Sequence, residues 1–207
     1  MPETFTPDDV LDAFREAGAL LEGHFLLSSG RHSDRYLEKA LVLQYPRNVE
    51  RMCLELARRF EGARPELVVG PTTLGVVLAY EVAKHLGVRS IFAENEGEGR
   101  VLRRGFRIGP GQRVLVVDDI LTTGGSVRDV LDVVSEWGGT PVGVGVLVDR
   151  SGGTLDFGVR LESLLRMEVM SYSPEACPLC DTGIPLVKPG TTPKPGHRAS
   201  VVEAPAL

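Results

Sequence analysis

The sequence predicts an α/β protein in which helices flank a mainly parallel central sheet. Short apolar runs, typical of buried strands, alternate with longer stretches whose apolar residues recur at helical spacing. Two of the runs end in glycine-containing turns that lead into a helix, which is a common connection between parallel strands. The length of 207 residues and the 43% hydrophobic and 25% charged content fit one globular domain.

The first 60 residues are predicted to hold two helices and one short strand. Thr6 and Pro7, followed by two acids, predict a helix start, because a hydroxyl cap, an early proline and negative charge all favour a helix N-terminus. A strand is expected at 25–27, before a turn at 28–30. A second helix follows, with Asn48 as its candidate cap. The apolar faces of the two helices consist of Val10, Leu11, Phe14 and Ala17, and of Met52, Cys53, Leu56 and Phe60.

Strands and helices are expected to alternate through the middle of the chain. The expected strands are 67–69, 90–93, 114–117 and 142–148, and the expected helices are 76–86 and 126–137. This β-α-β-β-α-β order predicts a mainly parallel sheet with helices on both faces. The polar, glycine-rich stretch 94–111 is long for a connection, so it forms either a β-hairpin or a mobile loop.

The most informative stretch is VLVVDDILTTGGS, residues 114–126. A buried strand leads into Asp118 and Asp119, then into hydroxyl and glycine residues, then into a helix. Such a turn suits phosphate, because backbone N–H groups and a helix N-terminus face the anion. Carboxylates would repel phosphate but accept hydrogen bonds from sugar hydroxyls, so the pattern predicts a ribose phosphate ligand near a divalent cation. The alternative is a plain strand-to-helix turn capped by Asp119 or Thr123.

This segment resembles the phosphoribosyl pyrophosphate loop of the type I phosphoribosyltransferases. From about residue 25 to residue 190 the chain is most similar to the orotate phosphoribosyltransferases within that family. The resemblance implies transfer of the phosphoribosyl group from 5-phosphoribosyl 1-pyrophosphate to orotate, giving orotidine 5′-monophosphate and pyrophosphate in de novo pyrimidine (UMP) biosynthesis. It also implies Mg²⁺ bound mainly through substrate and water, and a homodimer that shares its active sites.

The resemblance further implies how the chain is organised. A single phosphoribosyltransferase domain is expected over 1–187, with a small N-terminal hood at about 1–45 and a core at about 46–170. The last stretch, 188–207, contains four prolines and few large apolar residues, so we expect it to be mostly disordered.

Two turns are expected to hold phosphoribosyl pyrophosphate. Asp118 and Asp119 would bind the ribose hydroxyls and act in catalysis. The second turn, GPTTLG at 70–75, also follows an expected strand. Alone, this pattern usually marks only a turn, but the resemblance implies that it is the pyrophosphate loop. Leu74 stands where some orotate enzymes carry lysine. The residues assigned to this substrate are Asp118, Asp119, Ile120, Leu121, Thr122, Thr123, Gly124, Gly125, Ser126, Thr72, Thr73 and Lys39.

Arg150, at the end of the last expected strand, suits orotate. The arginine fork matches a planar carboxylate at two points, and orotate carries one on its ring. The alternative is a surface arginine paired with Asp149. The polar segment 25–39 would be a solvated turn on its own, whereas the resemblance makes it a hood over the base. The residues assigned to orotate are Thr122, Arg150, Ser29 and Phe25; Lys39 supplies a positive charge where some members have lysine at the position of Ser28.

Four arginines lie in the polar segment 94–107, which the resemblance makes a lid over the pyrophosphate. They are Arg100, Arg103, Arg104 and Arg107, and the segment holds no lysine or histidine. Because arginine stays charged, the predicted role is electrostatic stabilisation rather than proton donation, with Arg100 and Arg104 favoured as catalytic residues. The alternative is a hairpin whose arginines are solvated.

Cys177 and Cys180 form a CxxC pair, which raises a metal or a redox role. A zinc site needs about four ligands, and the one further candidate near the pair in the sequence is His197. The interpretation favoured from the sequence is a structural turn or a labile disulfide, and no metal ligand is assigned.

Charge and hydropathy argue against a nucleic-acid-binding protein and against a membrane-spanning one. A net charge of −5 argues against a nucleic-acid surface, which needs a basic face. No apolar run approaches the length of a membrane span, and the N-terminus lacks a signal pattern, so a cytoplasmic protein is expected. Two alternatives stay open: a phosphoribosyltransferase for a purine base or uracil, which has no ring carboxylate to bind, and a non-catalytic regulator that senses phosphoribosyl pyrophosphate.

Overall fold

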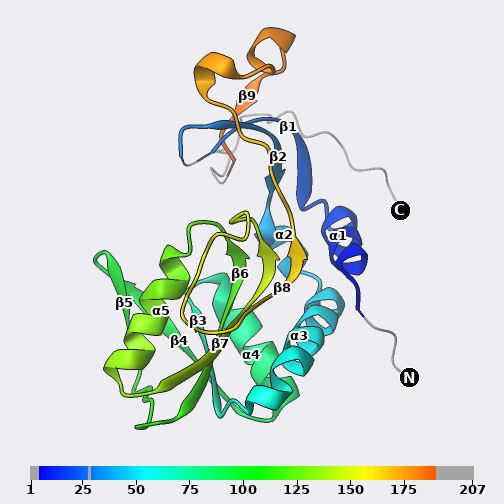
Figure 1. The fold of residues 1–207 in the computed structure, drawn as a ribbon. Coiled ribbons are helices and arrows are strands. Elements are labelled where there is room, and N and C mark those ends of the chain that lie inside the picture. The colour runs from blue at the N-terminus through cyan, green and yellow to red at the C-terminus, as the bar shows by residue number, and fades with distance from the viewer. Residues whose placement is uncertain (1–4, 28, 190–207) are drawn as a thin grey trace. The chain divides into compact units, whose positions relative to one another are not determined.

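The computed structural model describes residues 5–27 and 29–189, which form two compact units (Figure 1). The large unit holds residues 5–13 and 43–168, and the small unit holds 14–27, 29–42 and 169–189. The single domain over 1–187, with its hood and core, stays a prediction. Of the predicted tail, residues 190–207 lie outside the described part of the chain.

The large unit is built on a six-stranded sheet. Its strands, in spatial order, are β5 (Gly99–Val101), β4 (Arg89–Glu96), β3 (Leu67–Pro71), β6 (Arg113–Leu121), β7 (Thr140–Asp149) and β8 (Leu161–Arg166). Neighbouring strands run parallel, except that β4 and β5 form an antiparallel hairpin. The predicted α/β fold with a mainly parallel sheet is therefore confirmed, and the stretch 94–111 opens with the hairpin that was one of its two predicted forms.

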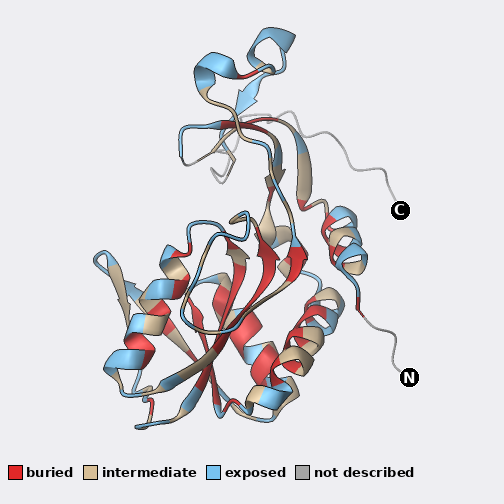
Figure 2. Ribbon diagram, in the orientation of Figure 1, coloured by how far each residue is buried: buried red, intermediate tan, exposed pale blue. Residues whose placement is uncertain are grey.

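Helices cover both faces of this sheet, and the buried residues concentrate in its central strands (Figure 2). On one face, Val127 and Val130 of α5 (Gly125–Glu136) pack in one core cluster with Val114 and Val116 of β6. Because side chains alternate along a strand, Val117 faces the other side. That side is covered by α3 (Pro46–Phe60) and α4 (Leu74–Leu86), which pack against each other.

Glycines in β7 let α3 approach the sheet closely. A Cβ atom on Gly143 would lie 2.3 Å from Cε1 of Phe60, and one on Gly145 would lie 3.1 Å from Cε2 of the same ring. Phe60 is fully buried, as are Met52, Cys53 and Leu56. The apolar face predicted for this helix is thus confirmed, and the absence of side chains at two β7 positions makes room for it.

The helix starts differ in how well the sequence predicted them. The predicted start at Thr6 is confirmed: α1 spans Pro7–Glu16, the Thr6 hydroxyl accepts the Asp9 N–H (3.3 Å), and the Thr6 N–H donates to the Asp9 carboxylate (2.7 Å). This reciprocal pair is a capping box. The Thr6 hydroxyl (2.6 Å) and N–H both donate to the Asp9 carboxylate and, with Arg51 nearby, lower the pKa of Asp9. The prediction of Asn48 as a cap is wrong, because α3 begins at Pro46, with Tyr45 in the cap position.

The small unit is a three-stranded sheet in the order β2 (His32–Leu37), β1 (Leu20–Leu26) and β9 (Leu186–Val187). β1 and β2 are antiparallel, and β9 adds to β1 in parallel. The remaining short elements of the structure are α2 (Lys39–Leu43), η1 (Glu61–Ala63), η2 (Pro174–Ala176) and η3 (Cys180–Thr182). Among the described residues of both units, no helix combines the length and the apolar character that crossing a membrane requires.

Candidate active site

Three polar segments follow the carboxyl ends of neighbouring parallel strands in the large unit. Strands β3, β6 and β7 are adjacent and parallel, so the segments after Pro71, Leu121 and Asp149 emerge at one edge of the sheet. The ends of β6 and β7 are tied together, because the Arg150 N–H donates to the Leu121 carbonyl (2.8 Å). This is the edge at which open α/β sheets place their ligands.

Asp118 and Asp119 lie inside β6 rather than after it. The sequence predicts a strand that stops at residue 117, whereas β6 runs to Leu121, because its backbone pairing with β7 continues that far. Both residues are buried: Asp118 is 7% exposed and Asp119 is 2% exposed. Asp118 accepts the N–H of Asp119 (2.8 Å), and Asp119 accepts the N–H of Ile120 (2.5 Å). These hydrogen bonds hold both carboxyl groups against the backbone of the strand.

The turn between β6 and α5 is shaped by a glycine that cannot be replaced without strain. Gly124 has a φ of +78°, and a Cβ atom there would lie 2.9 Å from the guanidinium of Arg128 and 3.0 Å from Leu155. Arg128 donates to the Thr123 carbonyl (2.9 Å). The first N–H groups of a helix have no acceptor within the helix, so those of α5 at Gly125 and Ser126 suit an anion.

The turn after β3 has the same design. A Cβ atom on Gly70 would lie 2.1 Å from the Gly75 carbonyl oxygen, and one on Gly75 would lie 2.5 Å from Pro71. The two glycines therefore let α4 begin at Leu74, three residues after the strand ends. The peptide bond between Thr72 and Thr73, in the middle of this turn, is cis.

Arg100, on β5, connects the two turns. One terminal guanidinium nitrogen donates to the Thr72 carbonyl (3.3 Å) and the Ala93 carbonyl (3.2 Å), and the other donates to the Ser126 hydroxyl (3.0 Å). The hairpin thus places one positive charge between both turns. Sequence reasoning favoured Arg100 in the lid but did not foresee its contact with Ser126, because the hairpin register decides where the side chain reaches.

Arg104 is placed differently from Arg100. Its guanidinium forms a two-point ion pair with the Glu94 carboxylate (2.8 and 3.3 Å) and lies over the Phe92 ring, 5.9 Å from its centre. Arg103 pairs with Glu96 through one terminal nitrogen (2.6 Å). The structure therefore holds Arg104 against the hairpin itself, and of the two favoured arginines Arg100 is the one it brings to the turns.

Asp149 ends β7 as a buried acid, 3% exposed. Its carboxylate accepts hydrogen bonds from the N–H (2.8 Å) and the hydroxyl (2.6 Å) of Ser151, and the Arg166 guanidinium lies 3.9 Å away. These contacts fix the backbone from which the side chain of Arg150 projects. Arg150 thereby starts at the same sheet edge as Thr122.

The remaining predicted contacts belong to the small unit. Phe25 is buried on β1 and packs against the Tyr36 ring, with ring centres 5.9 Å apart. Ser29 is exposed in the turn after β1, and Lys39 begins α2. Ser28 lies outside the described residues. The substrate contacts assigned to Phe25, Ser29 and Lys39 stay predictions.

The CxxC pair has further ligand candidates that lie far from it in the sequence. His197 lies outside the described residues, and the structure brings His24 and His32 to Cys177 and Cys180 instead. Both cysteines of the pair are free thiols. The histidines escaped notice because they are about 150 positions away in the sequence. A search for two histidines anywhere in the chain, rather than near the cysteines, would have found them.

The chain is similar in sequence and in structure to known phosphoribosyltransferases. The family described as "Phosphoribosyl transferase domain" matches residues 42–157. An orotate phosphoribosyltransferase of Pelotomaculum thermopropionicum is 56% identical over 186 residues, covering 90% of this chain and 98% of that protein. One of Desulforamulus reducens is 52% identical over 184 residues, covering 89% and 96%. The crystal structure of orotate phosphoribosyltransferase from Aeropyrum pernix has a TM-score of 0.64 at 31% identity, covering 76% of this chain and 93% of that chain.

Proposed function

This chain belongs to the orotate phosphoribosyltransferase family, and we propose that it works through the two turns joined by Arg100. Its reaction is the transfer of the phosphoribosyl group from 5-phosphoribosyl 1-pyrophosphate to orotate in pyrimidine biosynthesis. The products are orotidine 5′-monophosphate and pyrophosphate. Identity above 50% over nearly the full length of both chains supports this activity, and the bridging position of Arg100 is the observation that carries the assignment of the site.

Asp118 and Asp119 hold the ribose in this proposal. A ring nitrogen of orotate attacks C1 of the ribose while the bond from C1 to the pyrophosphate oxygen breaks, so positive charge develops on the ribose ring. Buried carboxylates at the end of β6 bind the ribose hydroxyls and stabilise that charge. Catalysis then consists largely of positioning and of electrostatic complementarity to the transition state.

The two turns divide the phosphates of the donor between them. Main-chain N–H groups and hydroxyls at 122–126 bind the 5′-phosphate at the start of α5. The turn at 72–75 binds the pyrophosphate, and Arg100, which contacts both turns, stabilises the negative charge that grows on this leaving group. Arg104 keeps its predicted catalytic role of electrostatic stabilisation from the lid, and its ion pair with Glu94 must open before it can contact pyrophosphate.

Mg²⁺ suits the chemistry of this edge. Carboxylate oxygens are the ligands that this hard cation prefers, and it commonly retains water and substrate phosphates in its coordination shell. Asp118 and Asp119 are the groups of this chain that would stand nearest to it, with most ligands supplied by substrate and water. When bound, the cation would neutralise charge on the departing pyrophosphate.

Orotate is recognised through its carboxylate in this proposal. The Arg150 fork binds that group, Thr122 lies beside it at the sheet edge, and Phe25 and Ser29 contribute from the small unit. Lys39 adds positive charge toward the donor phosphates. We further propose that the protein is a cytoplasmic homodimer. Its partners are these small molecules, and it binds neither nucleic acid nor a membrane.

A panel of bases tests this function. Purified protein is given phosphoribosyl pyrophosphate and Mg²⁺ together with orotate, uracil, adenine, guanine or hypoxanthine, and pyrophosphate release is followed. Of the five bases, we expect only orotate to support pyrophosphate release. An Arg150→Ala variant should lose orotate turnover while keeping affinity for the donor. Release with a purine or with uracil would refute the orotate assignment, and binding of the donor without any transfer would favour a regulator.

A further inference from the structure

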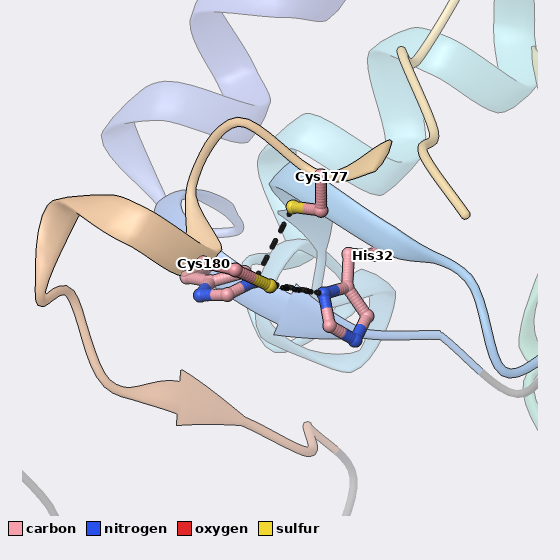
Figure 3. A group of neighbouring side chains, drawn as sticks. His32, Cys177 and Cys180 are labelled. Carbon is pink, nitrogen blue, oxygen red and sulfur yellow. Dashed lines mark hydrogen bonds between the residues drawn. The ribbon is translucent and has the colours of Figure 1, made fainter. Parts of the chain in front are cut away.

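Four side chains of the kinds that bind transition metals converge in the small unit. They are His24, His32, Cys177 and Cys180, and their ligand atoms all lie within 4.8 Å of one another. His24 comes from β1 and His32 from β2, whereas the cysteines come from the segment that contains η2 and η3. In Figure 3, the sulfur atoms of both cysteines and the ring of His32 point toward a common centre.

The separations between these atoms match a tetrahedral zinc site. His24 Nε2 lies 3.0 Å from His32 Nδ1, and the nitrogen–sulfur distances are 3.5 Å (Cys177 to His24), 3.8 Å (Cys180 to His24) and 3.4 Å (Cys180 to His32). Ligands placed ~2.0–2.3 Å from one Zn²⁺ at tetrahedral angles lie about 3.3–3.8 Å from one another. Four of the six separations therefore lie within a few tenths of an ångström of this range, and the other two are no longer than 4.8 Å, so one ion fits among the four atoms after a small rearrangement.

The surroundings of the histidines favour metal binding. Both are buried, at 3% and 5% exposed. The other ring nitrogen of His24, Nδ1, lies 3.2 Å from the Ile184 carbonyl, to which it can donate its proton. Nε2 then carries a lone pair directed at the cluster. Metal-binding histidines commonly have such a partner, which fixes the tautomer and the ring orientation.

The segment that supplies the cysteines has little else to hold it in place. Across residues 169–189 the side chain of Cys177 is the one that is buried, while Met170, Ile184 and Leu186 are exposed. It is attached to β1 and β2 by the two-residue strand β9 and, before η2, by the bridge between His32 and Tyr172 and by hydrogen bonds that Arg31 and Ser33 donate to backbone carbonyls. A small structure without an apolar core is commonly stabilised by a metal.

We propose that His24 Nε2, His32 Nδ1, Cys177 Sγ and Cys180 Sγ bind one Zn²⁺ as a closed structural site. Two thiolates and two imidazoles are a ligand set typical of tetrahedral zinc. Binding releases the two thiol protons to solvent and changes no oxidation state. With four protein ligands no position remains for water, so the site fastens the segment 174–187 to β1 and β2 rather than performing catalysis.

The proposed zinc site flanks a turn that carries part of the proposed active site. His24 directly precedes Phe25, and His32 follows Ser29 by three positions. Zinc would therefore fix both ends of the turn between β1 and β2, a consequence for orotate binding that rests on the proposed function. The existence of the site does not depend on that function, because metal content is measured without turnover.

Metal analysis of the full chain tests the proposal. Tag-free protein purified with reductant, and also after incubation with Zn²⁺ followed by gel filtration, is analysed by mass spectrometry of its metals. We expect about one zinc per chain. Replacement by Co²⁺ should give the visible absorption of tetrahedral cobalt together with a thiolate-to-cobalt charge-transfer band. Absence of zinc after reconstitution, a different metal in its place, or octahedral cobalt would overturn the proposal.

Variants locate the ion. Cys177→Ser combined with Cys180→Ser should abolish zinc and the charge-transfer band, and His32→Ala should lower zinc occupancy. Cys53→Ala and His85→Gln are matched controls, because Cys53 is buried in the large unit and His85 lies near two glutamates away from the cluster; both should retain zinc.

If the double variant fails to fold, wild-type protein stripped with a chelator replaces it: two thiols should become reactive on stripping and be protected again by added zinc. The assignment would be refuted if the double variant retains zinc, if a control variant loses zinc, or if the chelator does not change the reactivity of the thiols.

Discussion

Arg100 offers the sharpest test of the proposed active site, because one guanidinium contacts both turns. In Arg100→Ala, the donors to Thr72 and Ser126 are lost together, and with them the positive charge that is proposed to stabilise the leaving group. A hydrogen bond to a charged group contributes ~1.5–3 kcal/mol, so removing one such interaction from the transition state should lower kcat/KM for the donor by roughly 10- to 150-fold. Arg100→Lys keeps the charge but cannot reach both turns at once, and should recover only part of the loss.

The assay for Arg100 is pyrophosphate release at saturating orotate, with the donor concentration varied. Arg103→Ala is the matched control: this arginine lies two residues after β5 and pairs with Glu96 on the surface, so its loss should change kcat/KM less than twofold. Circular dichroism and thermal unfolding confirm that each variant is folded. An Arg100→Ala enzyme within twofold of wild type, or an equal loss in Arg103→Ala, would refute the reasoning.

Further predictions concern catalysis, packing, the buried thiol and the metal. Replacing Asp118 and Asp119 together by asparagine should cut turnover by orders of magnitude and leave the far-UV circular dichroism unchanged; retained turnover would contradict their role. Gly143→Ala places a Cβ atom 2.3 Å from a phenylalanine ring of α3 and should destabilise the protein by about 1–3 kcal/mol, whereas Gly62→Ala, with open space around it, should not; urea unfolding compares them. Burial raises the pKa of the Cys53 thiol, so this thiol should react with a thiol reagent at pH 8 only on unfolding, and its contribution to stability should be complete below its ordinary pKa of about 8.5 and decline above it. Protein stripped of zinc by a chelator, which is removed before the assay in Mg²⁺, should have a KM for orotate that rises more than its KM for the donor, and added zinc should reverse the change.

The predictable part of the fold is the part made of apolar runs. Residues 67–69 and 114–117 are continuous β-branched and leucine runs, which indicate buried parallel strands, and the structure confirms both. The extension of β6 through Asp118 to Leu121 could not be read in this way, because acids interrupt the apolar run. Backbone pairing with β7, rather than side-chain preference, sets where that strand ends.

Strands β2, β8 and β9 escaped prediction for a related reason. β2 reads HSDRYL, and its buried members include His32 and Ser33, which carry no hydrophobic signal. β8 is an edge strand with a mixed pattern. β9 has only two residues, both exposed. Backbone pairing builds these strands, with β1 for β2 and β9 and with β7 for β8, and their own side-chain patterns do not reveal it.

The candidate site divides in the same manner. The two glycine-containing turns and the acids between them were visible as motifs, because each is a local solution to the close approach of backbone and anion. The contacts of Arg100 and the meeting of His24 with Cys180 depend on hairpin register and on residues far apart in the chain. Such contacts follow from the tertiary fold alone.

A crystal structure of the protein with phosphoribosyl pyrophosphate and Mg²⁺ tests the central claim most directly. We expect the 5′-phosphate on the main-chain N–H groups of 122–126, the ribose hydroxyls on Asp118 and Asp119, and the pyrophosphate between the turn at 72–75 and Arg100. Donor bound elsewhere, or with its ribose turned away from both aspartates, would contradict it.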